Sequence, residues 1–323
     1  MEMLRFGIFS TASIVPRFIA AVQDTEGCCV TALASRDLEK AREKAAAWGV
    51  ERAYGSYEEL LSDPEVDAVY VAVISSEHGR WTRRALEVGK HVLCEKPFTI
   101  DPQEAEDLFA LAREKGLFVM EAQKAVFLPV MAELKRRIAA GELGTIRMAD
   151  FSSSFGAGYN SWFLDLAKGG GPMYSNAGYA AALLQYLFDC PAVKLEGLCT
   201  RSSMTAEDQF SAALLLENGI IGTLKTSVAV PLPNVAYLYG EKGYVEIPDF
   251  WKARSAVLHI TGKAPEVLEY PCKHELCYEI RHMADCISAG LLQSPVMTED
   301  LTVNTARLLR GLSESWQSAG LIG

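Results

Sequence analysis

The sequence predicts an α/β protein in two parts, an N-terminal doubly wound parallel sheet and a C-terminal α+β domain with an antiparallel sheet. Strand-like and helix-like segments alternate with short connections through the first 121 residues, which is typical of right-handed βαβ units. Beyond them, strand-like segments follow one another through tight turns. Because 323 residues exceed the needs of one small core, we expect domains at 1–121 and 122–323.

The first domain is predicted to be Rossmann-like. Its strands are expected at residues 4–9, 29–34, 68–74, 91–94 and 118–121, and its helices at 13–22, 38–48, 77–88 and 102–115. The segment 68–74 is apolar on both faces, as a central parallel strand must be when helices cover it on each side. Asp37 and Gly49 are placed to begin and end the second helix.

The second domain is expected to mix helices with consecutive strands. Helices are predicted at 129–140, 174–188, 274–289 and 298–317, and strands at 146–155, 210–216 and 220–229. The segment 239–247 is expected to fold back on itself through a turn at 241–243. The pair Asn218-Gly219 lies between two of these strands and is typical of a type I′ hairpin turn. A terminal helix can also pack back on the first domain, so the boundary near residue 121 is approximate.

The charge balance and the apolar runs exclude two classes of partner. Lys and Arg number 31 against 41 Asp and Glu, a net charge of −10, which disfavours nucleic acid because phosphate binding needs an excess of clustered cations. No apolar run reaches the roughly 18 residues of a membrane helix. The N-terminus shows no signal peptide, and eight cysteines without CxxC spacing indicate reduced thiols, so we expect a cytoplasmic protein.

No metal site is expected. Cys272, His274, Cys277 and His282 are close together in the sequence, but their spacing matches no common zinc pattern. The same segment is also typical of the start of an amphipathic helix.

The turn after the first strand is a candidate pyrophosphate site. It consists of Ser10, Thr11, Ala12, Ser13 and Ile14. Backbone amides at the start of a helix suit a phosphate, and ligands of parallel sheets bind outside the carboxyl ends of the strands. A dinucleotide fingerprint would have three glycines where this chain has Ser10, Ala12 and Val15, so an ordinary connection between strand and helix is the alternative.

The end of the second strand favours NADP over NAD. An NAD site usually has an acidic residue there, whereas this chain has Ser35 and Arg36. A guanidinium and a hydroxyl fit a 2′-phosphate. In the alternative, Arg36 is a surface charge and Asp37 binds the ribose, which would allow NAD.

Lys96 follows the predicted strand 91–94, at the edge of the sheet where a nucleotide binds. Its ammonium can bind a substrate oxygen and stabilise the alkoxide that develops during hydride transfer, with Glu95 holding it in place. Pro97 permits a cis peptide bond after Lys96. The alternative is a Glu-Lys turn without a chemical role.

The segment 89–97, GKHVLCEKP, closely resembles the most diagnostic motif of the Gfo/Idh/MocA family of oxidoreductases. GELG at 141–144 and GGG at 169–171 match two later motifs of that family. The resemblance implies a C-terminal sheet that is open-faced and largely antiparallel, whose exposed face commonly forms a homodimer or a higher homo-oligomer. It is strongest to the branch of dimeric dihydrodiol dehydrogenase and NADP-dependent D-xylose dehydrogenases.

The resemblance also assigns roles to residues. Ile74, Ser75 and His78 lie in a cofactor-contacting loop and helix, and Lys96 and Tyr179 share the acid–base role. A phenol acts as a base near neutral pH only when a nearby cation stabilises the phenolate, which Lys96 would supply. Without the family match, Tyr179 is equally a packing residue.

The chain departs from the family pattern at two places. Ser175, next to Asn176, stands where relatives commonly have an aspartate that orients the substrate. Val126 stands where many have an arginine, and Lys124 is a candidate substitute. Phe155, Tyr159 and Trp162 either line a substrate pocket or seal a domain interface.

These features predict an oxidoreductase that transfers a hydride between NADP and a sugar, polyol or vicinal diol. One alternative is a dinucleotide-binding sensor without catalysis, which Ser175 favours and the presence of Lys96 and Tyr179 disfavours. Another alternative is a glycoside-processing enzyme without net redox change.

Overall fold

The computed structural model describes residues 3–156, 161–202 and 205–323, and the chain divides into two compact units. The first unit comprises Met1–Thr99, Gln103–Ala122 and His274–Glu299, and the second Ile100–Pro102, Gln123–Lys273 and Asp300–Gly323. The segment His274–Glu299, placed in the second domain by the sequence, thus belongs to the first unit. Its helix packs against the first helix of the chain, and the Val119 amide donates to the Leu292 carbonyl at 3.4 Å.

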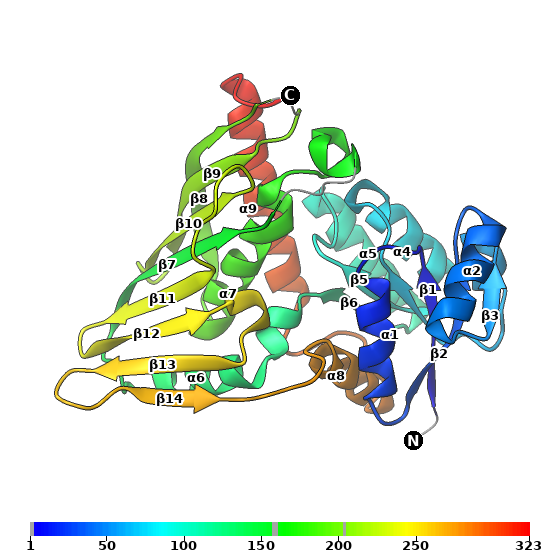
Figure 1. Cartoon of the computed structure of the whole chain (residues 1–323), viewed down its shortest axis with the longest axis horizontal. Coiled ribbons are helices and arrows are strands. Elements are labelled where there is room, and N and C mark those ends of the chain that lie inside the picture. Colours follow the sequence, from blue (N-terminus) through cyan, green and yellow to red (C-terminus); the bar gives the residue numbers. More distant parts are fainter. Residues whose placement is uncertain (1–2, 157–160, 203–204) are drawn as a thin grey trace. The chain divides into compact units, whose positions relative to one another are not determined.

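The first unit contains a six-stranded parallel sheet in the order β3-β2-β1-β4-β5-β6 (Figure 1). The strands are β1 (Leu4–Phe9), β2 (Cys28–Ala34), β3 (Arg52–Tyr54), β4 (Ala68–Val71), β5 (His91–Glu95) and β6 (Val119–Ala122). The predicted Rossmann-like sheet is therefore confirmed. Only the three-residue β3 was not predicted, because so short a strand leaves no hydrophobic pattern.

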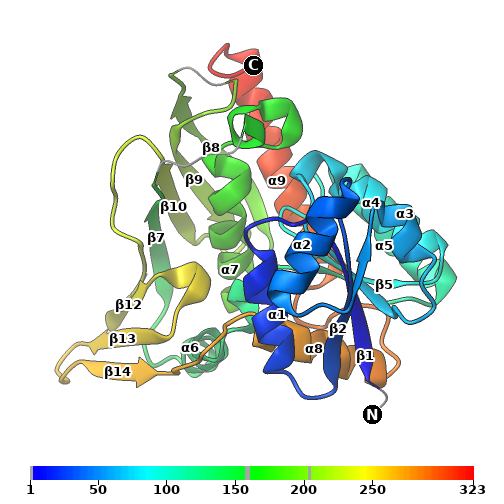
Figure 2. The same ribbon diagram turned by 45° about the vertical axis from the view of Figure 1, so that its right-hand side comes forward.

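Helices cover both faces of this sheet. They are α1 (Val15–Gln23), α2 (Leu38–Trp48), α3 (Tyr57–Leu61), α4 (His78–Glu87), α5 (Pro102–Lys115) and α8 (Cys277–Ser288). Figure 2 shows α1 and α8 on one face and α4 and α5 on the other. Asp37 caps α2 by accepting from the Lys40 amide, and Gly49 ends that helix at a φ of 70°, as the sequence predicted.

The second unit contains an eight-stranded sheet in the order β14-β13-β12-β11-β7-β10-β9-β8. The strands are β7 (Ile146–Ser154), β8 (Ala192–Thr200), β9 (Gln209–Leu216), β10 (Ile221–Ser227), β11 (Val235–Gly240), β12 (Gly243–Pro248), β13 (Ser255–Ile260) and β14 (Glu266–Glu269). Every neighbouring pair is antiparallel except β7 with β10. The predicted largely antiparallel sheet is therefore confirmed.

The turn between β9 and β10 differs from the type I′ hairpin that the sequence predicts. A type I′ turn needs positive φ at both central residues, and of the pair only Gly219 has it, at 88°. The Gly219 amide donates to the Leu216 carbonyl at 2.9 Å, and the Leu216 amide donates to the Ile220 carbonyl at 2.9 Å. The connection is a three-residue loop that ends in a left-handed glycine.

One face of the eight-stranded sheet is covered by helices and the other is open (Figures 1 and 2). The helices of this unit are α6 (Pro129–Ala139), α7 (Gly178–Phe188) and α9 (Glu299–Ser318). Trp316 on α9 is 1% exposed and donates its indole N–H to the Gly197 carbonyl at 2.8 Å. On the open face, large apolar and aromatic side chains are exposed, namely Met148, Leu198, Ile221, Tyr239 and Tyr244.

No helix within the described ranges is long and apolar enough to span a membrane. No disulfide joins any of the eight cysteines, all of which the structure describes.

Candidate active site

The turn after β1 is held in a left-handed conformation by Ser10. Its φ is 84°, an unusual value for a residue other than glycine and the conformation for which glycine is favoured. The Ser10 hydroxyl donates to the Ala72 carbonyl at 2.5 Å and accepts from the Ala12 amide at 3.2 Å. Since its single hydrogen is used on Ala72, Ser10 shapes the turn and does not add a hydroxyl donor for a phosphate.

Helix α1 begins without a capping side chain. Helix α1 has no side-chain hydrogen bond at its N-cap, Ile14, so no side chain competes there with an anion. Thr11, Ala12 and Ile14 are partly exposed and Ser13 is exposed. The Ala12 amide donates to the Ser10 hydroxyl, the Val15 amide donates to the Ala12 carbonyl, and Pro16 has no N–H, so the candidate amides for a phosphate are those of Thr11, Ser13 and Ile14.

Ser35 and Arg36 follow β2 directly. Ser35 is 8% exposed and its hydroxyl accepts from the Asp37 amide at 3.4 Å, whereas the Arg36 side chain is exposed. Asp37 accepts from the Lys40 amide at 3.2 Å, so one of its carboxylate oxygens is occupied in capping α2. This arrangement leaves a guanidinium at the carboxyl end of β2.

His78 is buried and lies between two loops. Its Nδ1 is 2.7 Å from the Pro97 carbonyl oxygen and its Nε2 is 3.1 Å from the Val73 carbonyl oxygen. Burial lowers the pKa of His78. The residue is 2% exposed, and its ring bridges Val73, just before Ile74 and Ser75, and Pro97, just after Lys96.

Lys96 stands at the end of β5, half-buried, and the peptide bond to Pro97 is cis. The Glu95 carboxylate accepts from the Tyr70 hydroxyl at 2.5 Å and from the Lys96 backbone amide at 3.3 Å. Glu95 thus holds the backbone of the turn. Burial raises the pKa of the Cys94 thiol, which disfavours a nucleophilic thiolate beside it.

Within the second unit, Lys124 and Tyr179 are in direct contact. The Lys124 ammonium donates to the Tyr179 hydroxyl at 2.6 Å and lies 4.7 Å from the centre of the ring. The two residues are 7% and 4% exposed. The sequence kept Lys124 as a candidate substitute for an arginine, and the structure adds its contact with Tyr179.

Ser175 and Asn176 lie in a π-helical turn, Met173–Ala177, that leads into α7. Such turns are rare and occur frequently at functional sites. Asn176 donates to the Ser153 hydroxyl at 2.9 Å, and that hydroxyl is 3.0 Å from the Thr226 hydroxyl. Asn176 is therefore held by hydroxyl groups of the sheet.

The aromatic candidates meet at Phe163. Phe155 packs edge-on against it with a centroid distance of 5.7 Å, and Trp162 does so at 5.9 Å. Tyr159 lies outside the described residues.

Two buried polar residues were missed by the sequence analysis. The Glu207 carboxylate accepts from the Met173 amide at 2.6 Å, and burial raises the pKa of Glu207 to about 7. Gln123 is fully buried, its side-chain oxygen and nitrogen have no hydrogen-bond partner among the described residues, and its amide nitrogen lies beside Gly178. No local pattern marks either residue, because both contacts join distant segments.

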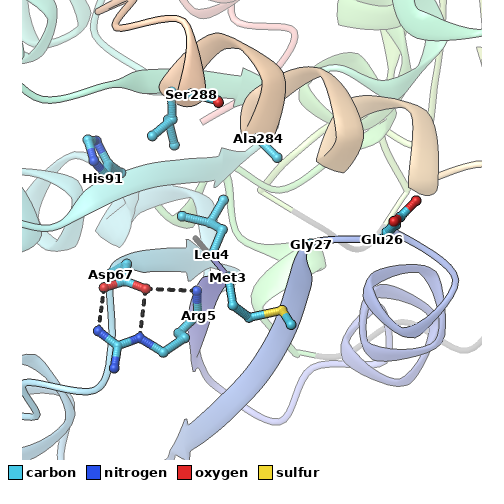
Figure 3. A pocket seen from close by; sticks show the side chains of 10 residues that line it. Met3, Leu4, Arg5, Glu26, Gly27, Asp67, His91, Ala284 and Ser288 are labelled. Atoms are coloured by element: carbon cyan, nitrogen blue, oxygen red, sulfur yellow. Dashed lines mark hydrogen bonds and ion pairs between the residues drawn. The ribbon is translucent and has the colours of Figure 1, made fainter. Parts of the chain in front are cut away.

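A pocket of about 700 Å³ lies at the other edge of the parallel sheet (Figure 3). It is lined by residues at the amino ends of the strands, among them Leu4, Asp67 and His91. Arg5 and Asp67 form an ion pair there at 2.7 Å. Since all strands of the sheet are parallel, this pocket lies at the edge opposite Ser10, Arg36 and Lys96. Among the described residues, no group of three or more His, Cys, Asp or Glu side chains is arranged to hold a metal.

Comparison with known proteins agrees with this geometry. The model of an oxidoreductase family with an NAD-binding Rossmann fold, GFO_IDH_MocA, matches residues 4–123, and the model of the GFO/IDH/MocA C-terminal domain matches residues 131–246. Trans-1,2-dihydrobenzene-1,2-diol dehydrogenase of Mus musculus is 32% identical over 303 residues, which cover 91% of each chain. The enzyme of the same name in Xenopus laevis is 30% identical over 309 residues, 91% of this chain and 92% of that one.

A solved structure is similar over nearly the whole length. KijD10, a 3-ketoreductase from Actinomadura kijaniata in complex with NADP and TDP-benzene, superposes with a TM-score of 0.86 at 25% identity, covering 97% of this chain and 98% of that one. With two family models that match both domains, the chain belongs to the GFO/IDH/MocA family and is an NAD(P)-binding oxidoreductase.

Proposed function

We propose that the protein transfers a hydride between NADP and a CH–OH group of a sugar, polyol or vicinal diol, with Lys96 and Tyr179 as catalytic residues. The observation that carries this proposal is the hydrogen bond that the buried Lys124 ammonium donates to the Tyr179 hydroxyl at 2.6 Å. A phenol oxygen beside a cation is suited to take and return the proton of a hydroxyl group. The two Mus and Xenopus relatives are named as dehydrogenases of a vicinal diol.

NADP is proposed over NAD because of Arg36. An exposed guanidinium stands at the end of β2, and the carboxylate of Asp37 is engaged in capping α2. A guanidinium binds a phosphate through two parallel hydrogen bonds, and the 2′-phosphate is what distinguishes NADP from NAD. Its pyrophosphate is assigned to the uncapped start of α1, at residues 11–14.

The residues have separate tasks in the proposed reaction. When bound, NADP supplies the nicotinamide carbon that accepts or donates the hydride together with its electron pair. The Lys96 ammonium stabilises negative charge on the substrate oxygen. Tyr179 takes the proton of the substrate hydroxyl during oxidation and returns it during reduction. Asn176, Phe155 and Trp162 are proposed to contact the substrate.

We further propose a cytoplasmic homodimer or higher homo-oligomer built through the C-terminal sheet. Exposed Met148, Leu198 and Ile221 on one face support an interface, because monomers rarely leave a wide apolar face in water. The eight cysteines without a disulfide support a reducing compartment. The net charge of −10 disfavours nucleic acid as a partner.

A panel of aldoses, inositols and trans-diols, assayed with NADP⁺ and with NAD⁺ by nicotinamide absorbance, tests the proposal. The expected result is turnover that is faster with NADP⁺. NADPH binding without turnover on any substrate would favour a sensor instead. Cofactor that remains bound through purification, together with product formed without an absorbance change, would favour glycoside processing.

A further inference from the structure

We infer that Lys124 is a positioning residue for Tyr179, whose ammonium holds the phenol oxygen that exchanges a proton with the substrate hydroxyl. This inference deepens the proposed function and rests on Tyr179 being its acid–base group. The family resemblance assigned the cation of Tyr179 to Lys96, so the inference gives Lys124 a role that the motifs do not predict.

In the hydrogen bond between Lys124 and Tyr179, only the lysine can be the donor. An ammonium has three N–H donors and no acceptor, so in the hydrogen bond of 2.6 Å the Tyr179 oxygen must accept. The hydrogen of the phenol is therefore not used on Lys124. A tyrosine held in this way presents its own hydrogen, or in the phenolate form its second lone pair, to a group other than the lysine.

Burial strengthens the effect of the lysine on the tyrosine. With residue exposures of 7% and 4%, both side chains are shielded from water, and the attraction between opposite charges grows as the local dielectric constant falls. A lysine is rarely buried without a partner that stabilises its charge. The ring face adds to this stabilisation, because the ammonium lies 4.7 Å from its centre.

The pair is internal to the second unit. Lys124 starts a short 3₁₀ turn, Lys124–Phe127, that contacts α7, which begins one residue before Tyr179. Lys96 belongs to the first unit. We assign Lys96 to the substrate oxygen and Lys124 to the phenol oxygen that it contacts, so the two lysines have different tasks.

The proton moves between the substrate oxygen and Tyr179, and Lys124 neither gains nor loses a proton. During oxidation the substrate O–H bond breaks and the proton bonds to the phenolate oxygen of Tyr179, which becomes a neutral phenol. Lys124 keeps all its protons and moves from stabilising a phenolate to donating a hydrogen bond to a phenol. During reduction the same proton returns to the substrate oxygen.

The test compares Lys124→Met and Lys124→Arg with Lys135→Met as a matched control. Lys135 also stacks on a tyrosine of α7, at 4.3 Å from the centre of the Tyr186 ring, but it pairs with Asp189 and stands outside the proposed chemistry. The first readout needs no substrate: the near-ultraviolet circular dichroism of Tyr179, isolated by subtracting the spectrum of Tyr179→Phe, reports whether the ring is held in one orientation. We expect Lys124→Met to lose most of this signal, because the phenol oxygen loses the ammonium that holds it. Lys124→Arg and Lys135→Met should keep it.

The second readout is turnover. Lys124→Met should lower kcat about 100-fold, Lys124→Arg should restore most of it, and NADPH binding should be unchanged in both variants. A Tyr179 dichroism signal or a kcat in Lys124→Met that coincides with wild type would overturn the inference. If Lys124→Met does not fold, Lys124→Gln serves in its place under the same criteria. Absence of turnover in the wild type would refute the proposed function, and the dichroism readout would still decide the role of Lys124.

Discussion

The buried carboxylate of Glu207 holds the first amide of the π-helical turn, that of Met173, at 2.6 Å. The carboxylate occupies the space beside Gly171, where a Cβ would come within 2.5 to 2.7 Å of its atoms. The glycine loop and the turn that leads to Tyr179 are thus fixed to Glu207, which itself lies just before β9. Burial with few donors raises the pKa of Glu207 to about 7, and the neighbouring charge of Asp208 adds to the rise.

Glu207→Gln should make the free energy of unfolding depend less on pH between pH 5 and 8. A carboxyl whose pKa is raised on folding, from 4.5 to about 7, favours the folded state most at low pH and destabilises it as pH rises through that window. The loss for wild type amounts to about 3 kcal/mol in the free energy of unfolding. In the variant, the side-chain amide oxygen can still accept from the Met173 amide, and the side chain carries no charge to ionise. Denaturant unfolding between pH 5 and 8 measures the difference.

The pH dependence of the free energy of unfolding must be compared between Glu207→Gln and wild type, because buried histidines change this free energy with pH in the opposite direction. Burial lowers the pKa of His78 and of His282, so their contribution is lost as pH falls. Glu217→Gln, at an exposed position, is the matched control and should follow the wild type. An unchanged pH dependence in Glu207→Gln would contradict the role given to burial.

Arg36→Glu should reverse the cofactor preference. The substitution places a carboxylate where the 2′-phosphate is proposed to bind, so we expect the Kd for NADPH to rise about 100-fold. The Kd for NADH should change far less, because that cofactor has a hydroxyl there. Fluorescence titration with both cofactors measures this. Arg42→Glu, a charge reversal on the exposed face of α2, is the control, and equal losses for both cofactors in Arg36→Glu would refute the phosphate contact.

His78→Ala should lower both the stability of the protein and its affinity for NADPH. It removes the ring that contacts the Pro97 and Val73 carbonyls and leaves both without that partner, at a cost of about 3 kcal/mol in the free energy of unfolding. The Kd for NADPH should rise about tenfold because the turn after Lys96 loses its support. His274→Ala removes a half-buried histidine near Asp24 and should leave NADPH binding unchanged. Wild-type affinity in His78→Ala would show that the turn is held without it.

Local signals in the sequence were sufficient for much of the fold. Asp37 and Gly49 mark the ends of α2 because capping depends on residues a few positions apart. The strands β8, β13 and β14 were not predicted. They lie at the two ends of a sheet with one face open. In β13 and β14, polar and apolar residues such as His259 and Val267 share that face and weaken the alternating pattern.

Only those residues of the candidate site that directly follow a predicted strand could be placed from the sequence. Lys96 and Arg36 follow strands directly, so their place at the carboxyl edge follows from the order of the elements. The partner of Tyr179 is 55 residues away, and the partner of Met173 is 34 residues away. Neither contact follows from spacing, because tertiary packing alone brings these residues together.

In the proposed reaction, Lys96 stabilises negative charge on the substrate oxygen and Tyr179 transfers the proton, while a hydride moves between nicotinamide and substrate. This assignment is tested most directly by the turnover of Lys96→Ala and of Tyr179→Phe on the best substrate of the panel, with NADPH binding measured in parallel. We predict a fall in kcat of about 10² to 10⁴ in each variant, with NADPH binding retained. Full turnover in either variant, with the protein folded, would contradict the account.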